Sequence, residues 1–312
     1  MVDNSIIAKS GSGAGVAKRT ICIQNPAAIS VKNESLAISQ NGDLKGLIPL
    51  EDIWVLIIEA HQVQVTAAAL SRLVDTGIGV MLCGDDHMPN GLLLPIGAHS
   101  RHAAIVEDQL AISKPLKKRL WQRIVRAKIA NQGKVLDLIG SDGSTVKRMV
   151  KEVLSGDTSN RESVAATAYF RRLLPRGGRR AGPYTPALDY GYTVLRSGIG
   201  RTAVSGGWLV SRGIHHSNNL NAFNLVDDLI EPFRPVVDLL VVQEELGGEL
   251  TSDIKRRLAS VFEILVKTTT GEVPVQVAIE EELDTLKTAV RKGDASLLEL
   301  PSVIPLKRAS LE

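Results

Sequence analysis

Acidic side chains gather on one face of a helix that the sequence predicts near residue 228. At about 100° per residue, the polar positions of this segment fall within roughly one third of the helix circumference; they are Asn224, Asp227, Asp228 and Glu231. Carboxylates this close repel one another, and a bound cation relieves that repulsion. The helix dipole, which favours acids in a first turn, explains the pattern without any ligand. The face is therefore a candidate metal-binding or catalytic surface with a structural alternative.

Pro232 and Pro235 interrupt this helical segment, which otherwise extends over 221–246. Because Pro232 has no backbone N–H, it predicts a kink one residue after Glu231, and such a kink would aim the Glu231 side chain. Arg234, beside these acids, can bind a phosphate oxygen or form a salt bridge. The prolines are consistent with a functional site but do not require one.

His215, His216 and Glu162 are further candidates upstream of the acidic helix. Imidazole is a ligand for Mn²⁺ that is tolerated with Mg²⁺, and it also serves as a general base. The alternative for the histidine pair is a loop that caps the helix start. Glu162 follows Ser159 at the spacing of a capping box, which accounts for this acid without any function.

Cationic side chains concentrate in the middle of the chain. Residues 101–220 carry 21 Lys and Arg against 8 Asp and Glu, a net charge of +13, whereas residues 1–100 and 221–312 carry net charges of −3 and −7. Segregated positive charge of this size indicates a polyanion partner, although a solvated basic face gives the same count. Seven of these cations lie in the segment 114–128, which contains no acid; they are Lys114, Lys117, Lys118, Arg119, Arg123, Arg126 and Lys128. A loop rich in Gly and Arg adds Arg176, Arg179 and Arg180. We expect these cations to bind DNA phosphates without reading sequence, with a strong dependence on salt.

A small β-rich domain is predicted before these segments, over residues 19–86. Apolar, β-branched runs bounded by turn residues predict strands over 20–24, 28–31, 36–39, 53–58 and 78–83. The run 53–58 is apolar throughout, as expected of a strand buried on both faces. Thr66 is expected to cap a helix over 67–75 that stops at Gly77.

Beyond residue 100 the apolar spacing becomes helical. The predicted helices cover 102–112, 115–139, 144–154, 160–174, 187–210, 221–246, 251–268 and 275–291. The expected fold class is therefore α+β. We expect a flexible leader over 1–18, the β-rich domain over 19–86, a linker rich in turn formers over 87–101, and a larger all-helical catalytic and DNA-binding domain over 102–312.

Length and composition limit the class of protein. A chain of 312 residues, of which 44% are hydrophobic, can fill the cores of two domains. No stretch approaches about 18 uninterrupted apolar residues, so the sequence predicts no transmembrane helix. Cys22 and Cys83 lie in apolar, strand-like runs and are interpreted as reduced thiols in a cytoplasmic protein.

Taken together, the site residues and their neighbours resemble the CRISPR-associated integrase of spacer acquisition, the first-numbered Cas protein. The resemblance rests, in chain order, on Asn160 to Glu162, Ala165 with Ala166, Tyr169 with Phe170, Leu188 to Tyr192, Gly213 to His216, Phe223 to Pro235, and Asp238. The compact forms of the segments Leu188 to Tyr192 and Phe223 to Pro235 are most similar to the type II branch. The leader through Lys18 has no counterpart in the family.

The resemblance implies a site, a reaction and partners. Glu162, His216 and Glu231 match the family's triad, which holds Mg²⁺ or Mn²⁺, and Asp228 matches as an auxiliary acid. The family's spacing points to His216, and the doubled histidine leaves His215 as the alternative. The implied reaction joins 3′-hydroxyl ends of short DNA fragments to a CRISPR repeat by transesterification, and it becomes endonuclease cleavage when water replaces the hydroxyl. The implied assembly on double-stranded DNA is a homodimer, formed through the β-rich domain, with a small ferredoxin-like partner, the second-numbered Cas protein.

Two other functions fit parts of the pattern. A non-catalytic DNA-binding scaffold would use the cations and keep the acidic face for structure. A metal-dependent phosphohydrolase of small substrates would use the acids, but it has no need for so extended a basic region. Tyr169 and Tyr192 are expected to pack rather than to stack on splayed bases, and Glu280–Glu282 is interpreted as a solvated helix face.

Overall fold

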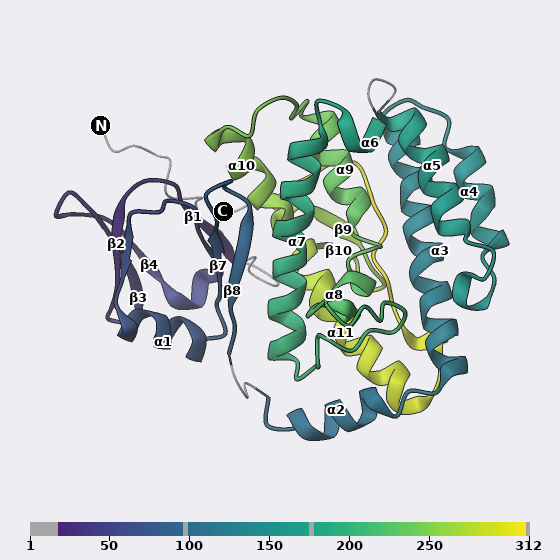
Figure 1. Cartoon of the computed structure of the whole chain (residues 1–312), viewed down its shortest axis with the longest axis horizontal. Helices are drawn as coiled ribbons and strands as arrows, with labels where there is room; N and C mark the ends of the chain where they lie inside the picture. The colour runs from purple at the N-terminus through teal and green to yellow at the C-terminus, as the bar shows by residue number, and fades with distance from the viewer. Residues whose placement is uncertain (1–17, 96–98, 175–177, 310–312) are drawn as a thin grey trace.

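Two four-stranded sheets form the N-terminal part of the computed structural model, which describes residues 18–95, 99–174 and 178–309 (Figure 1). The first sheet has the strand order β1 (Arg19–Ile23), β5 (Ile53–Ile58), β7 (Gly79–Cys83) and β8 (Pro89–Leu93). Its first three strands are parallel, and β8 runs antiparallel to β7. The second sheet has the order β4 (Asp43–Pro49), β3 (Ser35–Gln40), β2 (Ala27–Lys32) and β6 (Val63–Val65), in which only β2 and β6 are parallel.

One apolar core receives side chains from both sheets and from α1 (Ala67–Asp75). The pairing of β2 with β3 places Ile29 opposite Ile38, and both are buried because alternate residues of a strand face the same side. The helix contributes Leu73 to this core. The Thr66 hydroxyl oxygen accepts the Ala69 N–H at 3.1 Å, which confirms the predicted helix cap.

Strand β5 is buried on both faces, as its continuous apolar run predicts. Ile53, Leu56 and Ile58 belong to the core between the sheets. Trp54 and Ile57 belong to a second, larger core that extends through the helical part. This strand therefore contributes side chains to both hydrophobic cores of the chain.

Helices dominate the chain beyond residue 101. Their bounds are α2 (His102–Leu110), α3 (Lys114–Leu138), α4 (Ser144–Met149), α5 (Arg161–Leu173), α6 (Gly178–Ala181), α7 (Thr185–Ser205), α8 (Asn224–Leu229), α9 (Arg234–Gln243), α10 (Ser252–Ala259) and α11 (Val275–Lys292). In Figure 1, α7 and α10 face the β-rich part, whereas α3, α4 and α5 form the opposite side. The expected α+β class, a β-rich region followed by a larger helical one, is confirmed.

Three local predictions need correction. The predicted helix over 221–246 is wrong as a single element, because it breaks between α8 and α9, where Pro232 removes a hydrogen-bond donor. The predicted helix over 251–268 ends at Ala259, and β9 (Leu265–Lys267) then pairs with β10 (Glu272–Pro274) inside the part expected to be all-helical. Strand β8 lies within the stretch interpreted as a linker. A short apolar run fits a strand as well as a helix, so periodicity alone did not separate them.

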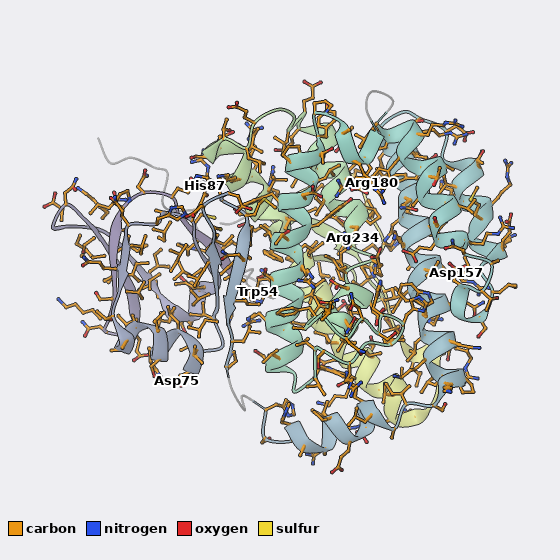
Figure 2. The ribbon with its side chains drawn as sticks, in the orientation of Figure 1. Trp54, Asp75, His87, Asp157, Arg180 and Arg234 are labelled. Atoms are coloured by element: carbon orange, nitrogen blue, oxygen red, sulfur yellow. The ribbon has the colours of Figure 1, made fainter. Side chains whose placement is uncertain are left out.

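The β-rich part packs against α7 and the turn after α10. The rings of Trp54 and Phe262 meet edge to face, with centroids 4.5 Å apart. Figure 2 shows Trp54 where the β-rich part meets α7. Gly198 of α7 makes this contact fit, because a Cβ at that position would lie 2.4 Å from the Phe262 ring and 2.7 Å from Trp54. Arg201, one turn further along, donates to the Gly77 carbonyl oxygen at 2.7 Å. The two parts thus share packed side chains and a hydrogen bond.

Two further expectations concern Glu282, which is not solvated as expected, and the two cysteines, which are free thiols as expected. Glu282 of α11 is 1% exposed and neither carboxylate oxygen has a hydrogen-bond partner, so the interpretation of Glu280–Glu282 as a solvated face is wrong for this residue. Burial raises its pKa well above the usual range. Cys22 and Cys83 carry free thiols, and burial raises the pKa of both to about 12.

The expected absence of a transmembrane helix can be checked within the described ranges, where no helix combines the length and apolarity that a membrane crossing requires. The predicted leader, apart from Lys18, and Arg176 lie outside the described residues.

Candidate active site

Three segments of the helical part bring two glutamates to one lysine. Glu162 comes from the first turn of α5, Glu231 from the turn between α8 and α9, and Lys128 from the middle of α3. The Lys128 ammonium lies 2.6 Å from Glu162 Oε1 and forms an ion pair with Glu231 Oε2. The Glu231 side chain is 7% exposed and that of Lys128 is 11% exposed, so this is a buried charge cluster. Lys128 was predicted as a surface contact to DNA, but its burial excludes that position.

Glu162 is free to face this cluster because another acid caps its helix. Asp157 accepts the backbone N–H groups of Arg161 and Glu162 at 2.8 and 3.0 Å. Asn160 adopts a left-handed conformation with φ 51° and makes no side-chain cap. The capping-box interpretation of Glu162 is therefore wrong, and its carboxylate is available for the cation at the site.

Glu231 is held in its ionised form by two neighbouring cations. Although burial alone would raise its pKa, the charges of Lys128 and Arg234 lower the pKa to about 2. Arg234 Nε donates to Glu231 Oε1 at 2.9 Å. The carbonyl of Pro232 is fixed by the Asn131 amide at 2.9 Å, which holds the turn that carries Glu231. Figure 2 shows Arg234 inside the helical part of the molecule.

Asp228 organises the loop that presents the histidine pair. Its fully buried carboxylate accepts the backbone N–H groups of Ile214, His215 and His216 at 2.5, 3.0 and 3.1 Å, and the His216 ring Nδ1 lies 2.8 Å away. Gly213 allows the loop to approach this closely, since a Cβ there would lie 2.6 Å from Asp228 Oδ2. The hydrogen bond to Asp228 raises the pKa of His216 against the opposing effect of burial.

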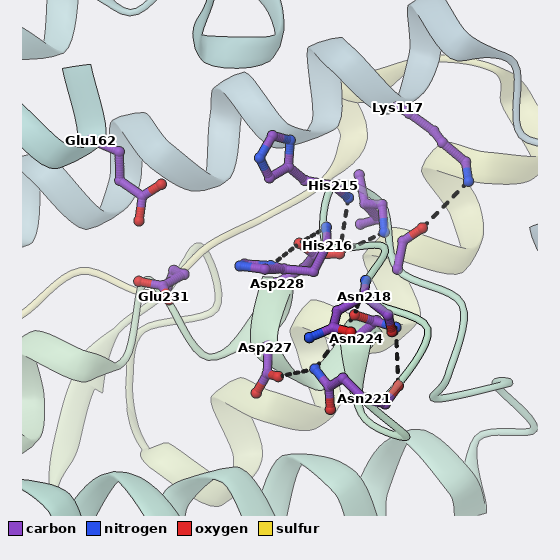
Figure 3. Close-up of polar contacts among 12 residues, drawn as sticks. Lys117, Glu162, His215, His216, Asn218, Asn221, Asn224, Asp227, Asp228 and Glu231 are labelled. Atoms are coloured by element: carbon purple, nitrogen blue, oxygen red, sulfur yellow. Dashed lines mark hydrogen bonds and ion pairs between the residues drawn. The ribbon is translucent and has the colours of Figure 1, made fainter. Parts of the chain in front are cut away.

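The two histidines have different surroundings. His215 stacks on the buried Trp121 ring, with centroids 4.2 Å apart and planes 2° apart. His216 keeps Nε2 for another partner, because its Nδ1 is engaged by Asp228. Figure 3 shows Glu162 and Glu231 on the same side of the Asp228–His216 pair. These surroundings favour His216 as the residue available to a ligand.

The remaining acid of the predicted face has its own protein partners. Asp227 pairs with Arg196, whose Nε lies 2.6 Å from its carboxylate, and accepts the Asn221 amide at 2.6 Å. Asn224 donates to three loop carbonyls. Protein groups thus relieve the repulsion predicted along this face, and a single shared cation is not needed for that purpose.

The carboxylates of Glu162 and Glu231 and the imidazole of His216 are ligand types that suit Mg²⁺ or Mn²⁺. These side chains do not form a closed coordination shell. Among residues 18–95, 99–174 and 178–309, no three His, Cys, Asp or Glu side chains converge closely enough to hold a metal ion. Glu231 Oε2 is nevertheless buried and forms an ion pair with the Lys128 ammonium. Two carboxylates and an imidazole are oxygen and nitrogen donors of the kind that such a divalent cation accepts. Glu162, Glu231 and His216 are the residues that would hold it.

A second buried cluster adjoins the site and was missed as such in the sequence. Tyr169 donates to Asp238 Oδ2 at 2.8 Å, and Tyr192 donates to Oδ1, which confirms that both tyrosines pack. Despite these hydrogen bonds, burial raises the pKa of Asp238 to about 6. A pocket of about 190 Å³ joins this cluster to Lys128 and Glu231. Asp238 lay in the quoted sequence pattern, but only the fold reveals its partners.

The predicted DNA-binding cations divide into exposed and engaged groups. Lys114, Lys118, Arg119 and Arg180 are exposed on the surface. The others donate to backbone oxygens or to an acid: Lys117 to Gly213, Arg123 to Leu298, Arg126 to Val153, and Arg179 to Asp189. The engaged group therefore contributes to the fold as well as to the positive charge.

Fold and site together define an α+β protein whose helical part holds a buried lysine between two glutamates. The chain belongs to the CRISPR associated protein Cas1 family, whose model matches residues 21–174 and 176–262. A CRISPR-associated endonuclease Cas1 from Neisseria meningitidis serogroup C is 39% identical over 302 residues, which cover 94% of this chain and 99% of that protein.

Solved structures share the fold at lower identity. A chain of a Cas6-RT-Cas1–Cas2 complex superposes with a TM-score of 0.72 at 17% identity, over 94% of this chain but 37% of that longer chain. A casposase bound to integration product also has a TM-score of 0.72, at 16% identity, with 89% and 93% coverage. Identities this low establish the common fold alone.

Proposed function

We propose that this chain is a metal-dependent DNA integrase and endonuclease of CRISPR spacer acquisition. In this proposal it joins the 3′-hydroxyl ends of short DNA fragments to a CRISPR repeat by transesterification, with Glu162, His216 and Glu231 as its catalytic residues and Mg²⁺ or Mn²⁺ as cofactor. Membership of the Cas1 family supports the class of enzyme. The relative from Neisseria meningitidis, which matches over nearly its whole length, is named an endonuclease.

One observation carries the assignment of the site. Glu162 and Glu231 come from separate segments and yet meet at one buried cation, Lys128, beside a histidine oriented by Asp228. The Glu231 side chain is 7% exposed and that of Glu162 is 26% exposed. Carboxylates that converge on a buried cation are rare outside functional sites because burying charge is costly. The basic surface nearby suits a polyanionic substrate.

The chain's own groups have definable tasks in this chemistry. A bound Mg²⁺ or Mn²⁺ would stabilise charge on the phosphoryl oxygens and lower the pKa of the attacking hydroxyl. Asp228 fixes the His216 ring through Nδ1, so that Nε2 remains available to bind a cation or accept a proton. Arg234 and Arg179 line the pocket beside Glu231 and place positive charge where a phosphate oxygen would approach.

We further propose that the working assembly contains double-stranded DNA, a second copy of this chain and a small Cas2-like partner. The structural neighbours support this composition: one is a complex of Cas1 with Cas2, and another is a casposase bound to integration product. The β-rich part is the proposed dimerisation surface.

A strand-transfer assay tests the proposal. Full-length protein and its Cas2-like partner are mixed with a short duplex bearing free 3′-hydroxyls and a supercoiled plasmid that contains the repeat. Joining should require Mn²⁺ or Mg²⁺, stop with EDTA, and fall by about 100-fold or more in Glu162→Ala, His216→Ala and Glu231→Ala. Glu272→Ala is a matched control, because Glu272 is half-exposed on β10 and pairs only distantly with Lys307.

The competing function is a DNA-binding scaffold without chemistry. It is favoured by Lys128, whose ammonium already contacts both carboxylates in the chain as it stands. Duplex binding without joining by the wild-type protein would support the scaffold. Joining that persists in one of the three alanine variants would remove that residue from the site.

A further inference from the structure

The proposed chemistry leaves Lys128 unexplained. Its ammonium contacts both carboxylates assigned to the metal, and its side chain is nearly buried in the middle of α3. An ammonium between two carboxylates satisfies them in the same way as a bound cation. Lys128 therefore already fills the position that a metal ion would need.

The charges at this position are balanced. The two positive charges of Lys128 and Arg234 offset the two negative charges of Glu162 and Glu231. Lys128 contacts both carboxylates, and Arg234 contacts that of Glu231. A divalent ion between the same carboxylates would lie within contact distance of the ammonium, and like charges repel strongly where water is excluded. The lysine in its present conformation and a bound metal ion exclude each other.

A second resting place for the ammonium lies one helical turn away. Gln132 follows Lys128 at i+4 on α3, so both side chains are on the same face of the helix. Gln132 is 2% exposed, and its Oε1 is a buried acceptor without a hydrogen-bond partner. Lys128, Gln132 and Asp238 all line the pocket of about 190 Å³. The pocket offers space, an unsatisfied carbonyl oxygen and a carboxylate to a displaced ammonium.

We propose that Lys128 is an internal cation that occupies the site in the metal-free protein and moves toward Gln132 when a metal ion binds. Lys128 is then a positioning residue that lowers the affinity for metal and holds the carboxylates together until metal arrives. This inference rests on the proposed metal site at Glu162 and Glu231. It makes the affinity for metal depend on a residue that need not be a ligand.

Metal binding by the full-length, metal-free protein tests this exchange without any DNA chemistry. Mn²⁺ is titrated into each variant, and the free aquo ion is followed by its electron paramagnetic resonance signal. Lys128→Met removes the competing charge and should lower the Kd for Mn²⁺ by about tenfold or more. Lys128→Arg keeps the charge and should not tighten binding. Lys134→Met is the matched control, because Lys134 lies on the same helix but contacts Ser302.

Gln132→Leu closes the second resting place and should act in the opposite direction. With Lys128 present, it should weaken Mn²⁺ binding by about threefold or more, since the ammonium loses its alternative partner. In the Lys128→Met background it should have no effect, because nothing remains to be displaced. This non-additivity separates displacement from a general disturbance of the site.

Circular dichroism of each variant checks that the chain is folded, and Lys128→Gln replaces Lys128→Met if the latter unfolds without metal. Suppose that wild type binds Mn²⁺ and that Glu162→Ala and Glu231→Ala do not. If Lys128→Met and Lys128→Gln then bind Mn²⁺ no more tightly than wild type, the exchange is wrong and the metal site stands. Absence of Mn²⁺ binding in wild type and both Lys128 variants would overturn the exchange together with the proposed metal site.

Discussion

Asp228 Oδ1 holds His216 at two points, the backbone N–H at 3.1 Å and the ring Nδ1 at 2.8 Å. The histidine is thereby fixed in both position and rotamer, while its Nε2 stays free. Carboxylate–histidine pairs of this kind orient a ligand or a base for its task. The relationship leads to a prediction for the ring itself.

Asp228→Asn should lower the pKa of His216, because the ionised acceptor of its ring proton is lost. Proton NMR titration of the His216 ring measures this directly. Strand transfer should fall by about 10- to 100-fold in the same variant. Asp227→Asn is the control, since Asp227 pairs with Arg196. An equal decrease in the pKa of His216 in this control would contradict the specific role of Asp228.

Glu282 should make the stability of the protein fall as the pH rises. Its pKa is raised in the folded chain by burial, so the unfolded chain loses this proton first, above its ordinary pKa. As the pH rises above about 4.5, the ordinary pKa of a glutamate, the free energy of unfolding should therefore decrease by up to about 1.4 kcal/mol per pH unit. Chemical denaturation of wild type and Glu282→Gln from pH 4 to 8 tests this. The advantage of the variant should grow with pH, and parallel pH profiles would show that Glu282 titrates normally.

Lys255 and Glu59 form a buried ion pair between α10 and the end of β5, with side chains 6% and 7% exposed. Lys255→Met should destabilise the protein by up to about 3–5 kcal/mol, because the buried Glu59 carboxylate then keeps the Gln24 amide and the His87 ring as neighbours but loses its lysine. Adding Glu59→Gln should recover much of that loss. Denaturant unfolding of the two single variants and the double variant gives the coupling, and an additive result would argue against a direct ion pair.

The exposed cations should control duplex binding, and the engaged cations should control stability. Replacing Lys118, Arg119 and Arg180 together by Ala should reduce the slope of log affinity against log salt by about 2–3 and leave thermal unfolding unchanged. Arg123→Ala should instead lower the melting temperature, because the guanidinium donates twice to the Leu298 carbonyl oxygen. Fluorescence anisotropy with a labelled duplex at several salt concentrations distinguishes the two effects.

Local patterns were sufficient for much of the fold. Three correct predictions depend only on neighbours in sequence: the strand from the apolar run of β5, the Thr66 cap, and the helices from the change of period beyond residue 100. The structure confirms each of them. The elements that were missed lack such a pattern. The short strands β9 and β10 depend on pairing with each other, and a single proline decided the break between α8 and α9.

The site shows the same division. Its carboxylates and histidine could be selected from residue type and from the family resemblance. The roles of Lys128 and Asp157 could not, because they arise from contacts between distant segments. Glu282 was misplaced for a related reason: charged residues are almost always solvated, and only the packing of α11 reveals this exception.

Strand β5 has a consequence for how the chain tolerates division. Because its two faces serve different cores, removing the β-rich part would expose the apolar surface of α7 and Phe262 that now packs on Trp54. The isolated helical half would carry a solvent-exposed apolar patch and would aggregate readily. The boundary that looks natural in the sequence is thus a poor place to cut, and the two halves should melt in a single cooperative transition.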